Sequence, residues 1–203
     1  MKLLIFSDIH GDKAALERLM EQDADYYFCA GDLANWGKGL DVLGPVMQRH
    51  ADRVYIIPGN HESEVDIAHF CERFGFHNFH GKSMRIGEHV VAALGYSNPT
   101  PFNTPGEYTE EELAERLSKF DDEKPEVLIC HCPPKSTRLD RAGEGQHFGS
   151  QSVREFIGKS QPRYFYCGHI HEAAGASETF GRTEGFNVGK QGRSLLLDAA
   201  RQD

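Results

Sequence analysis

Residues 2–10, KLLIFSDIH, place an uninterrupted apolar run directly before two polar side chains, Asp8 and His10. An apolar run of this length is typical of a short strand that is buried on both faces. The same order occurs four more times, and the later runs are Tyr26–Ala30 before Asp32, Val54–Ile57 before Asn60 and His61, Val127–Cys130 before His131, and Tyr164–Cys167 before His169 and His171. Five predicted strands therefore end in side chains that can bind a metal ion.

Segments with a helical spacing of apolar residues separate these strands. Four of these predicted helices begin at residues that can cap a helix. They are residues 14–20 after Asp12, residues 63–73 starting at Ser63, a helix starting at Thr109, and residues 150–159 starting at Ser150. Glu112 would complete a capping box with Thr109. The weaker expectations are a helix over 39–50, hairpins around Gly87-Glu88 and over 178–187, an ordered loop over 135–149, and a strand over 194–197. Strands that alternate with helices predict an α/β fold, and without a visible repeat or boundary we expect one domain over residues 1–203.

The composition is that of a folded, water-soluble protein, with 39% apolar and 26% charged residues among 203. The net charge of −9 disfavours an extended nucleic-acid interface, because an acidic surface repels the phosphate backbone. No apolar run is long enough to span a bilayer, and the N-terminal residues lack the features of a secretory signal. Five cysteines without a Cys-x-x-Cys pair are consistent with a reducing compartment. We therefore expect a cytoplasmic protein with no membrane partner, whose oligomeric state the sequence does not determine.

The polar residues at the strand ends form a chemically consistent set. In open α/β sheets, functional sites form at the carboxyl ends of the strands, where the loops converge. Two Asp, one Asn and several His supply oxygen and imidazole ligands, which suit Mn, Fe, Zn or Co better than Ca. A carboxylate can bridge two cations, and two cations about 3.5–4 Å apart can stabilise both the attacking and the leaving oxygen at phosphorus. Each motif alone is common in turns, but the ordered placement at five strand ends favours a metal site.

This ordered set of motifs resembles the calcineurin-like metallophosphoesterases. The motifs are Asp8-x-His10, Gly31-Asp32, Gly59-Asn60-His61-Glu62, His131 and Gly168-His169-x-His171. The resemblance implies a four-layer α-β-β-α sandwich of two mixed sheets flanked by helices, with a site for two metal ions. It implies that one metal is held by Asp8, His10, Asp32 and His171, and the other by Asp32, Asn60, His131 and His169. Asp32 would bridge the two ions, and His61 would face the substrate as a catalytic residue.

Shorter stretches narrow the resemblance to a subgroup. They are Ser97–Phe102, His131–Pro134, His147–Ser150 and Gly168–Glu172, and they look like the small single-domain Icc-related phosphoesterases, near the class III cyclic-nucleotide phosphodiesterases. The phosphoprotein phosphatases carry an Asp-Arg pair after Gly-Asp, whereas Gly31-Asp32 continues here as Leu-Ala-Asn35. The phosphate-binding Arg is therefore missing, and Asn35 replaces the acid that would orient the catalytic His. Protein dephosphorylation is disfavoured.

The resulting hypothesis is hydrolysis of a small phosphodiester, with a cyclic nucleotide as one candidate, by a hydroxide that bridges two divalent ions. Asn60 would help to neutralise charge at phosphorus, and His61 would protonate the leaving oxygen or stabilise its charge. The expected partner is a small phosphate ester. Phosphomonoester hydrolysis and nuclease activity at the same site are alternatives, and so is a non-catalytic binding scaffold. The sequence contains neither a phosphate-binding P-loop nor a Gly-x-Ser-x-Gly nucleophile motif.

Several residues close to these motifs allow two interpretations. Glu62 and Glu172 follow ligand positions, where they would orient the imidazoles or, in the case of Glu62, cap a helix. Trp36 and Phe102 are interpreted as packing residues that could alternatively line the binding site of a flat leaving group. His147 lies in a polar loop before the last predicted helix, where a surface position is the first expectation and a place in the site is the second.

Overall fold

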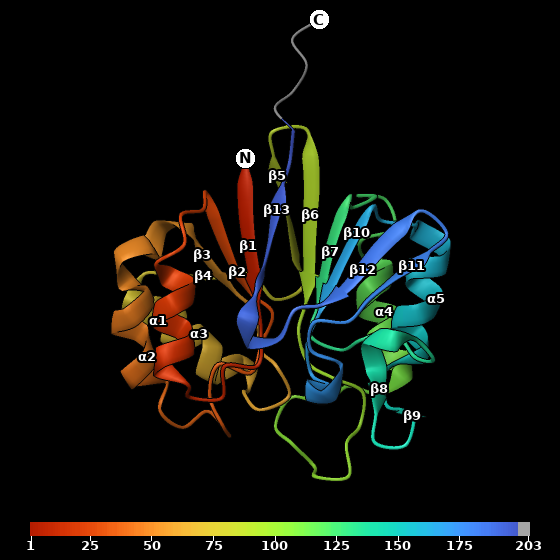
Figure 1. The fold of residues 1–203 in the computed structure, drawn as a ribbon, viewed down its shortest axis with the longest axis horizontal. Coiled ribbons are helices and arrows are strands. Elements are labelled where there is room, and N and C mark those ends of the chain that lie inside the picture. Colours follow the sequence, from red (N-terminus) through yellow and green to blue (C-terminus); the bar gives the residue numbers. More distant parts are fainter. Residues whose placement is uncertain (199–203) are drawn as a thin grey trace, which may run out of the picture.

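The computed structural model describes residues 1–198 and contains two mixed β-sheets packed face to face (Figure 1). The first sheet has the order β13 (Arg193–Leu196), β1 (Lys2–Phe6), β2 (Tyr26–Cys29), β3 (Val54–Ile56), β4 (His77–Asn78). The second has the order β11 (Ser177–Phe180), β12 (Thr183–Asn187), β10 (Tyr164–Cys167), β7 (Val127–Cys130), β6 (His89–Leu94), β5 (Lys82–Ile86). A small hairpin, β8 (Arg141–Ala142) and β9 (Gln146–His147), lies outside both sheets.

Parallel strands form the centre of each sheet. β1 to β4 pair in parallel, and β13 joins β1 in the antiparallel direction. In the second sheet β6, β7, β10 and β12 are parallel, while β5 and β11 close the two edges as antiparallel strands. Parallel strands require crossover connections, so the loops that follow β1, β2, β3, β7 and β10 all leave from the carboxyl ends of the sheets.

Helices cover the outer faces of the two sheets. The helices are α1 (Lys13–Met20), α2 (Leu40–Met47) and α3 (Glu64–Phe74) on the first sheet, and α4 (Glu110–Ser118) and α5 (Gln151–Ser160) on the second (Figure 1). The expected caps are present: Asp12 accepts the N–H of Ala15 at 2.9 Å, and Thr109 with Glu112 forms a capping box. No helix among residues 1–198 is long and apolar enough to cross a membrane.

Three apolar layers separate the four layers of secondary structure. Alternate residues of β1 show how they form, because Leu4 and Phe6 pack toward α1–α3 whereas Leu3 and Ile5 pack between the sheets. The third layer, which includes Leu128 of β7, lies between the second sheet and the helices α4 and α5. Strands with apolar residues on both faces are those that such a sandwich requires. The predicted four-layer α-β-β-α architecture of two mixed sheets is confirmed.

The structure differs from the sequence predictions in three places. The helix expected over 39–50 ends at Met47, and 3₁₀ turns over Gln48–Arg53 continue it. The expected loop over 135–149 contains a 3₁₀ turn, Arg138–Asp140, and the β8–β9 hairpin. Strand β4 was missed, because its two residues, His77 and Asn78, are polar and only their pairing with β3 makes them a strand.

Gly44 in α2 and Gly158 in α5 allow a matched test of how tightly the outer helices pack. Alanine ordinarily stabilises a helix interior relative to glycine by roughly 0.5–1 kcal/mol. A Cβ at Gly158 would meet no atom within 4 Å, whereas one at Gly44 would lie 2.4 Å from the ring of Phe74 in α3. We expect Gly158→Ala to raise the free energy of unfolding by that amount and Gly44→Ala to lower it by about 1–3 kcal/mol, both measured by urea denaturation. Equal stability of the two variants would contradict this packing of α2 against α3.

Candidate metal centre

The carboxyl ends of strands from both sheets meet at one rim. Main-chain hydrogen bonds join the loops there: Asp8 N–H to the Gly31 carbonyl (3.0 Å), and Gly168 N–H to the His131 carbonyl (3.1 Å). In Figure 1 this rim lies at the lower ends of the central strands, near the loop that follows β6 and the β8–β9 hairpin. Side chains from β1, β2, β3, β7 and β10 are thereby brought together from positions more than a hundred residues apart in the chain.

Four of the predicted ligand residues form one group: Asp8, His10, Asp32 and His171. One potential ligand atom from each lies within 4.8 Å of the others. The Nε2 atoms of His10 and His171 are 2.9 Å apart. The Nε2 atom of His10 lies 3.5 Å from Oδ2 of Asp32, and that of His171 lies 3.7 Å from Oδ1 of Asp8. Two carboxylates and two imidazoles thus face a common point.

A second group adjoins the first through the same carboxylate. Oδ1 of Asn60 lies 3.0 Å from Nε2 of His131 and 2.8 Å from Nδ1 of His169. Nε2 of His131 is 3.4 Å from Oδ2 of Asp32, the oxygen that also faces His10. The Nδ2 amide of Asn60 donates to Thr104 Oγ1 at 3.1 Å, and this fixes which end of the amide points at the imidazoles. The structure therefore brings all seven predicted metal-ligand residues together, in two groups that share Asp32.

The hydrogen bonds behind the ligands show that this donor set fits cations. Nδ1 of His10 lies 2.8 Å from Oδ1 of Asn35, and Nδ1 of His131 lies 2.8 Å from the carbonyl of Ala30. Both partners are acceptors, so both Nδ1 atoms carry a proton, and Nε2 is the atom that each ring would offer to a cation. Nε2 of His131 faces the carbonyl oxygen of Asn60, with which it forms a hydrogen bond in the absence of a metal ion. Imidazoles that are oriented from behind by acceptors and face oxygen ligands form a set that a cation can complete by replacing the proton on Nε2.

The pKa values of the buried side chains also favour a bound cation. Burial raises the pKa of Asp32, but the charge and hydrogen bond of His131 and the charge of His10 outweigh it and hold the pKa well below its usual range. Burial lowers the pKa of His131, yet the charge of Asp32 raises it to about 9. Burial and the charge of His131 together lower the pKa of His169 to about 4. The buried carboxylate thus holds a positive charge beside it, and a divalent ion would supply that charge instead of a proton.

The backbone at the ligand positions is unusual. Asp8, His10, Asp32 and His169 all have positive φ, between 47° and 70°. Asp and His tolerate the left-handed region better than most residues, but each costs about 1 kcal/mol or more and persists only where the surroundings enforce it. A Cβ at Gly59 would lie 2.0 Å from Oδ1 of Asp32, so the chain before Asn60 approaches the carboxylate as only glycine can. This close approach requires Gly59 of the motif.

Glu62 connects the loops that carry the ligands. Its carboxyl group is fully buried and accepts three main-chain N–H groups, from Asp32 (3.1 Å), Ala34 (2.8 Å) and Gly59 (3.0 Å). Both sequence interpretations of Glu62 were wrong: it neither orients an imidazole nor caps α3, whose cap is Ser63. Burial and the charge of Asp32 raise the pKa of Glu62 to about 8.

His61 lies beside the centre without being one of its ligands. Its ring packs edge-on against His10 at 5.0 Å and Trp36 at 5.9 Å, and its main-chain N–H donates to Oδ1 of Asp32 at 2.9 Å. Its Nδ1 atom is buried and has no hydrogen-bond partner within residues 1–198. The expectation that Asn35 takes the place of an acid beside the catalytic histidine is not met, because Asn35 contacts His10 instead.

A cavity of about 520 Å³ opens next to these side chains, and Asp32, Asn60, His61, His169 and His171 line one part of it. The loop after β6 and the segment before α5 supply Phe102, Lys135, His147 and Phe148 to the remaining walls, and Glu172 lines the cavity from the turn after β10. The interpretation of Phe102 as a packing residue was wrong, because Phe102 is 73% exposed and lines the cavity, whereas Trp36 is 49% exposed and packs its ring edge-on against His61. His147 reaches the site, as the second of its two interpretations allowed.

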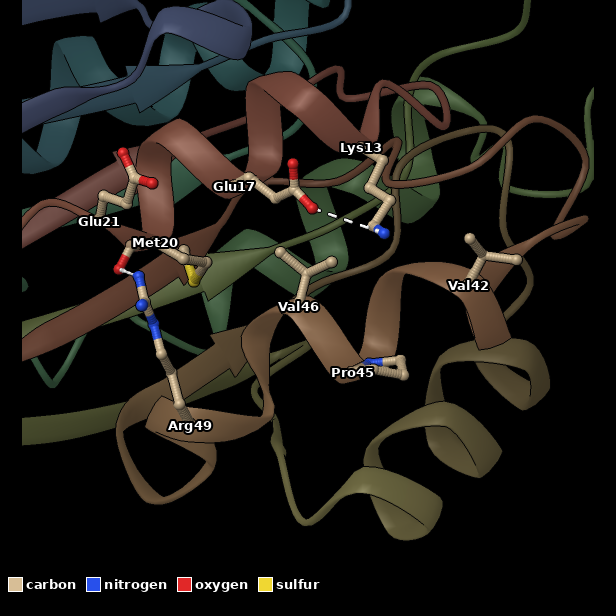
Figure 2. A pocket seen from close by; sticks show the side chains of 8 residues that line it. All are labelled: Lys13, Glu17, Met20, Glu21, Val42, Pro45, Val46 and Arg49. Carbon is tan, nitrogen blue, oxygen red and sulfur yellow. Dashed lines mark hydrogen bonds and ion pairs between the residues drawn. The ribbon is translucent and has the colours of Figure 1, made fainter.

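A second hollow, of about 550 Å³, lies between α1 and α2 on the outer surface (Figure 2). Within it Lys13 pairs with Glu17 at 3.5 Å, and Arg49 donates to the main-chain carbonyl of Met20. None of the strand-end ligands lines it. We therefore assign the chemistry to the cavity at the rim of the sheets.

Comparison with known proteins identifies the family of this chain. The model of the calcineurin-like phosphoesterase family matches residues 1–173. The chain belongs to this family. A relative of this phosphoesterase, the uncharacterized protein MJ1162 of Methanocaldococcus jannaschii, is 32% identical over 179 residues, which are 85% of this chain and 81% of the relative.

Two solved structures share the fold of this calcineurin-like phosphoesterase at low sequence identity. TT1561 of Thermus thermophilus has a TM-score of 0.72 at 17% identity, covering 94% of this chain and 90% of that one. Phosphopantetheinyl hydrolase (PptH) from Mycobacterium tuberculosis has a TM-score of 0.68 at 15% identity, with coverage of 97% and 96%. Family membership and the Asp/His cluster together indicate a hydrolase of phosphate esters that uses divalent metal ions.

The role of Glu62 in this phosphoesterase can be tested by measuring the free energy of unfolding of two variants. Glu62→Ala removes the acceptor of three buried N–H groups, each costing about 1–3 kcal/mol when unsatisfied. We expect the free energy of unfolding of the metal-free protein to fall by at least about 3 kcal/mol in urea denaturation. Glu172→Ala, a change at an exposed glutamate that also follows a ligand position, is the matched control and should change stability by less than about 0.5 kcal/mol. Equal effects of the two substitutions would contradict the proposed anchoring by Glu62.

Proposed function

We propose that this phosphoesterase hydrolyses a small phosphodiester with two divalent cations, of which Mn, Fe, Zn and Co are the candidates. The observation that carries the proposal is the position of Oδ2 of Asp32, which lies 3.5 Å from His10 in one ligand group and 3.4 Å from His131 in the other. A carboxylate shared by two groups suits two neighbouring ions, and such a pair, when bound, activates water and stabilises charge at phosphorus.

In this proposal Asp8, His10, Asp32 and His171 hold one ion, and Asp32, Asn60, His131 and His169 hold the other. Thr104 accepts the amide N–H of Asn60, which directs the amide oxygen toward the imidazoles. Burial lowers the pKa of His61, which favours the neutral ring. Donation of an N–H to the leaving oxygen is therefore the role that suits His61 better than full proton transfer.

A diester is favoured over a monoester by the cavity itself. Among the described residues Lys135 is the only Lys or Arg side chain that lines it, so residues 1–198 offer no arginine there to bind the extra charge of a monoester. The cavity of about 520 Å³ accommodates a small molecule, and the net charge of −9 opposes binding of an extended nucleic acid. We therefore propose a small phosphate ester as the partner, with no nucleic-acid or membrane partner. The five cysteines are buried free thiols, which supports a reducing, cytoplasmic compartment.

Two substitutions separate metal binding from catalysis. Asp32→Ala removes the shared carboxylate, so we expect loss of bound metal, measured by elemental analysis after loading with Mn and gel filtration. His61→Ala should retain the metal of the wild type but lose at least about 100-fold in kcat on bis-p-nitrophenyl phosphate. His69→Ala, an exposed histidine on α3, is the control and should match the wild type in both measurements. Full activity of His61→Ala, or undiminished metal in Asp32→Ala, would refute these assignments.

A substrate panel distinguishes the remaining alternatives. Bis-p-nitrophenyl phosphate, 2′,3′- and 3′,5′-cyclic nucleotides, p-nitrophenyl phosphate and DNA would each be tested with Mn, Zn, Fe and Mg. We expect turnover of the small diesters, much less of the monoester and none of DNA. Faster turnover of the monoester would identify a phosphomonoesterase, cleavage of DNA a nuclease, and metal binding without any turnover a non-catalytic scaffold.

A further inference from the structure

The segment between β7 and α5 is folded around one buried carboxyl group. Asp140 is fully buried and accepts main-chain N–H groups from Ser136 (3.1 Å), Thr137 (2.8 Å) and Gly149 (3.0 Å). These bonds join the two ends of the segment and hold the β8–β9 hairpin between them. The wall of the cavity is therefore an ordered structure with a fixed position relative to the sheet.

His147 is held by this carboxyl group and faces the cavity. Its Nδ1 lies 2.7 Å from Oδ1 of Asp140, so Nδ1 carries the proton and donates it. The side chain is 35% exposed and lines the same cavity as His61 and His169. Its Nε2 atom has no hydrogen-bond partner within the part of the chain that the structure describes. The tautomer and the orientation of the ring are thus fixed, while one ring nitrogen remains available to a ligand.

Lys135 lies on the same wall. Its main-chain N–H donates to the carbonyl of Ser150 at 2.9 Å, and the N–H of Ser150 donates to the carbonyl of Pro133 at 2.9 Å. These two bonds join the start of the segment, which contains Lys135, to its end, which contains His147. Within residues 1–198 the lysines that form ion pairs are Lys13, Lys159 and Lys190, and Lys135 is not among them. Lys135 therefore lines the cavity without an ion-pair partner in the described range, in a protein whose net charge is −9.

We propose that Lys135 and His147 form a second phosphate-binding site in this cavity, separate from the metal centre. The substrate would then carry a phosphate group in addition to the ester that reacts. This inference rests on the proposed function and narrows its substrate class to phosphorylated phosphodiesters.

The chemistry of the two side chains suits a terminal phosphate. Lysine supplies three donors on a flexible stem, and a phosphate offers several acceptor oxygens that donors can approach from different directions. A phosphate monoester has its second pKa near 6, so its monoanion carries a P–O–H group that can donate to Nε2 of His147. Phe102 and Phe148, 73% and 46% exposed, line the same cavity and offer apolar surfaces to the organic part of the substrate. Glu172 also lies on the cavity wall, where its negative charge, like that of Asp32, opposes the binding of anions.

Binding of simple phosphates tests the proposal without requiring turnover. The probes are alkyl phosphates and the corresponding alkane-α,ω-bisphosphates with about two to six carbons, titrated calorimetrically into the Mn-loaded protein. One phosphate of each probe can occupy the metal centre, and only the bisphosphates can reach the second site as well. We expect at least one bisphosphate to bind about 10-fold or more tightly than its monophosphate, since charged hydrogen bonds of this kind typically contribute that much. The carbon number with the largest gain reports the spacing of the two sites.

Two variants test whether Lys135 and His147 supply the additional affinity for the bisphosphate. Lys135→Met keeps the length of the side chain without its charge. His147→Asn can keep the hydrogen bond to Asp140, because the Asn amide can replace Nδ1–H, but it has no equivalent of Nε2. Each variant should reduce the affinity ratio of bisphosphate to monophosphate to about 3-fold or less. Lys119→Met and His69→Asn, exposed residues outside the cavity, are the matched controls and should keep the ratio of the wild type.

The possible outcomes separate this inference from the proposed function. A ratio near one at every chain length in the wild type overturns the second site, and so does a ratio that both Lys135→Met and His147→Asn leave intact. Hydrolysis of bis-p-nitrophenyl phosphate is measured on the same preparation. A protein that hydrolyses this diester but prefers no bisphosphate retains the proposed function and loses only the second phosphate site.

Discussion

The buried carboxylate of Asp32 is the constraint on which the site depends. Only 1% of the residue is exposed, so its charge must be compensated within the protein, because a buried unpaired charge costs several kcal/mol. Oδ1 receives the main-chain N–H of His61, while Oδ2 faces His10 and His131. Glu62 holds the backbone of Asp32 in place from behind. One acidic side chain therefore connects ligands from both sheets in a single electrostatic unit.

The fold makes this unit possible because the two sheets contribute different ligands. The first sheet carries Asp8 and Asp32, and the second carries His131 and His169, so neither sheet alone contains a complete centre. The apolar layer between the sheets fixes the distance between the two sets of ligands. Close packing resists changes in that distance, since a well-packed core deforms little. The strain of positive φ at the ligand residues is sustained by the same packing.

The walls of the cavity are built differently from its metal-ligand rim. The rim consists of short turns that follow directly from buried strands, whereas the walls come from the loop after β6 and the segment around Asp140. The candidate metal ligands are thus placed on rigid elements, and in the proposed function the loops would contact the rest of the substrate. Exposed rings such as Phe102 lie on these walls, where an organic group would otherwise meet water.

The sequence by itself determined the apolar strands, the α/β class and the candidate ligands, because apolar runs and strand-end Asp and His residues are local signals. It also showed the glycine beside Asn60, but not the approach to Asp32 that requires it. Only the tertiary structure decided that Glu62 binds three backbone N–H groups and that His147 rests on Asp140. These contacts join loops whose relative positions depend on how the two sheets pack, and no spacing along the chain encodes a distance across two packed sheets.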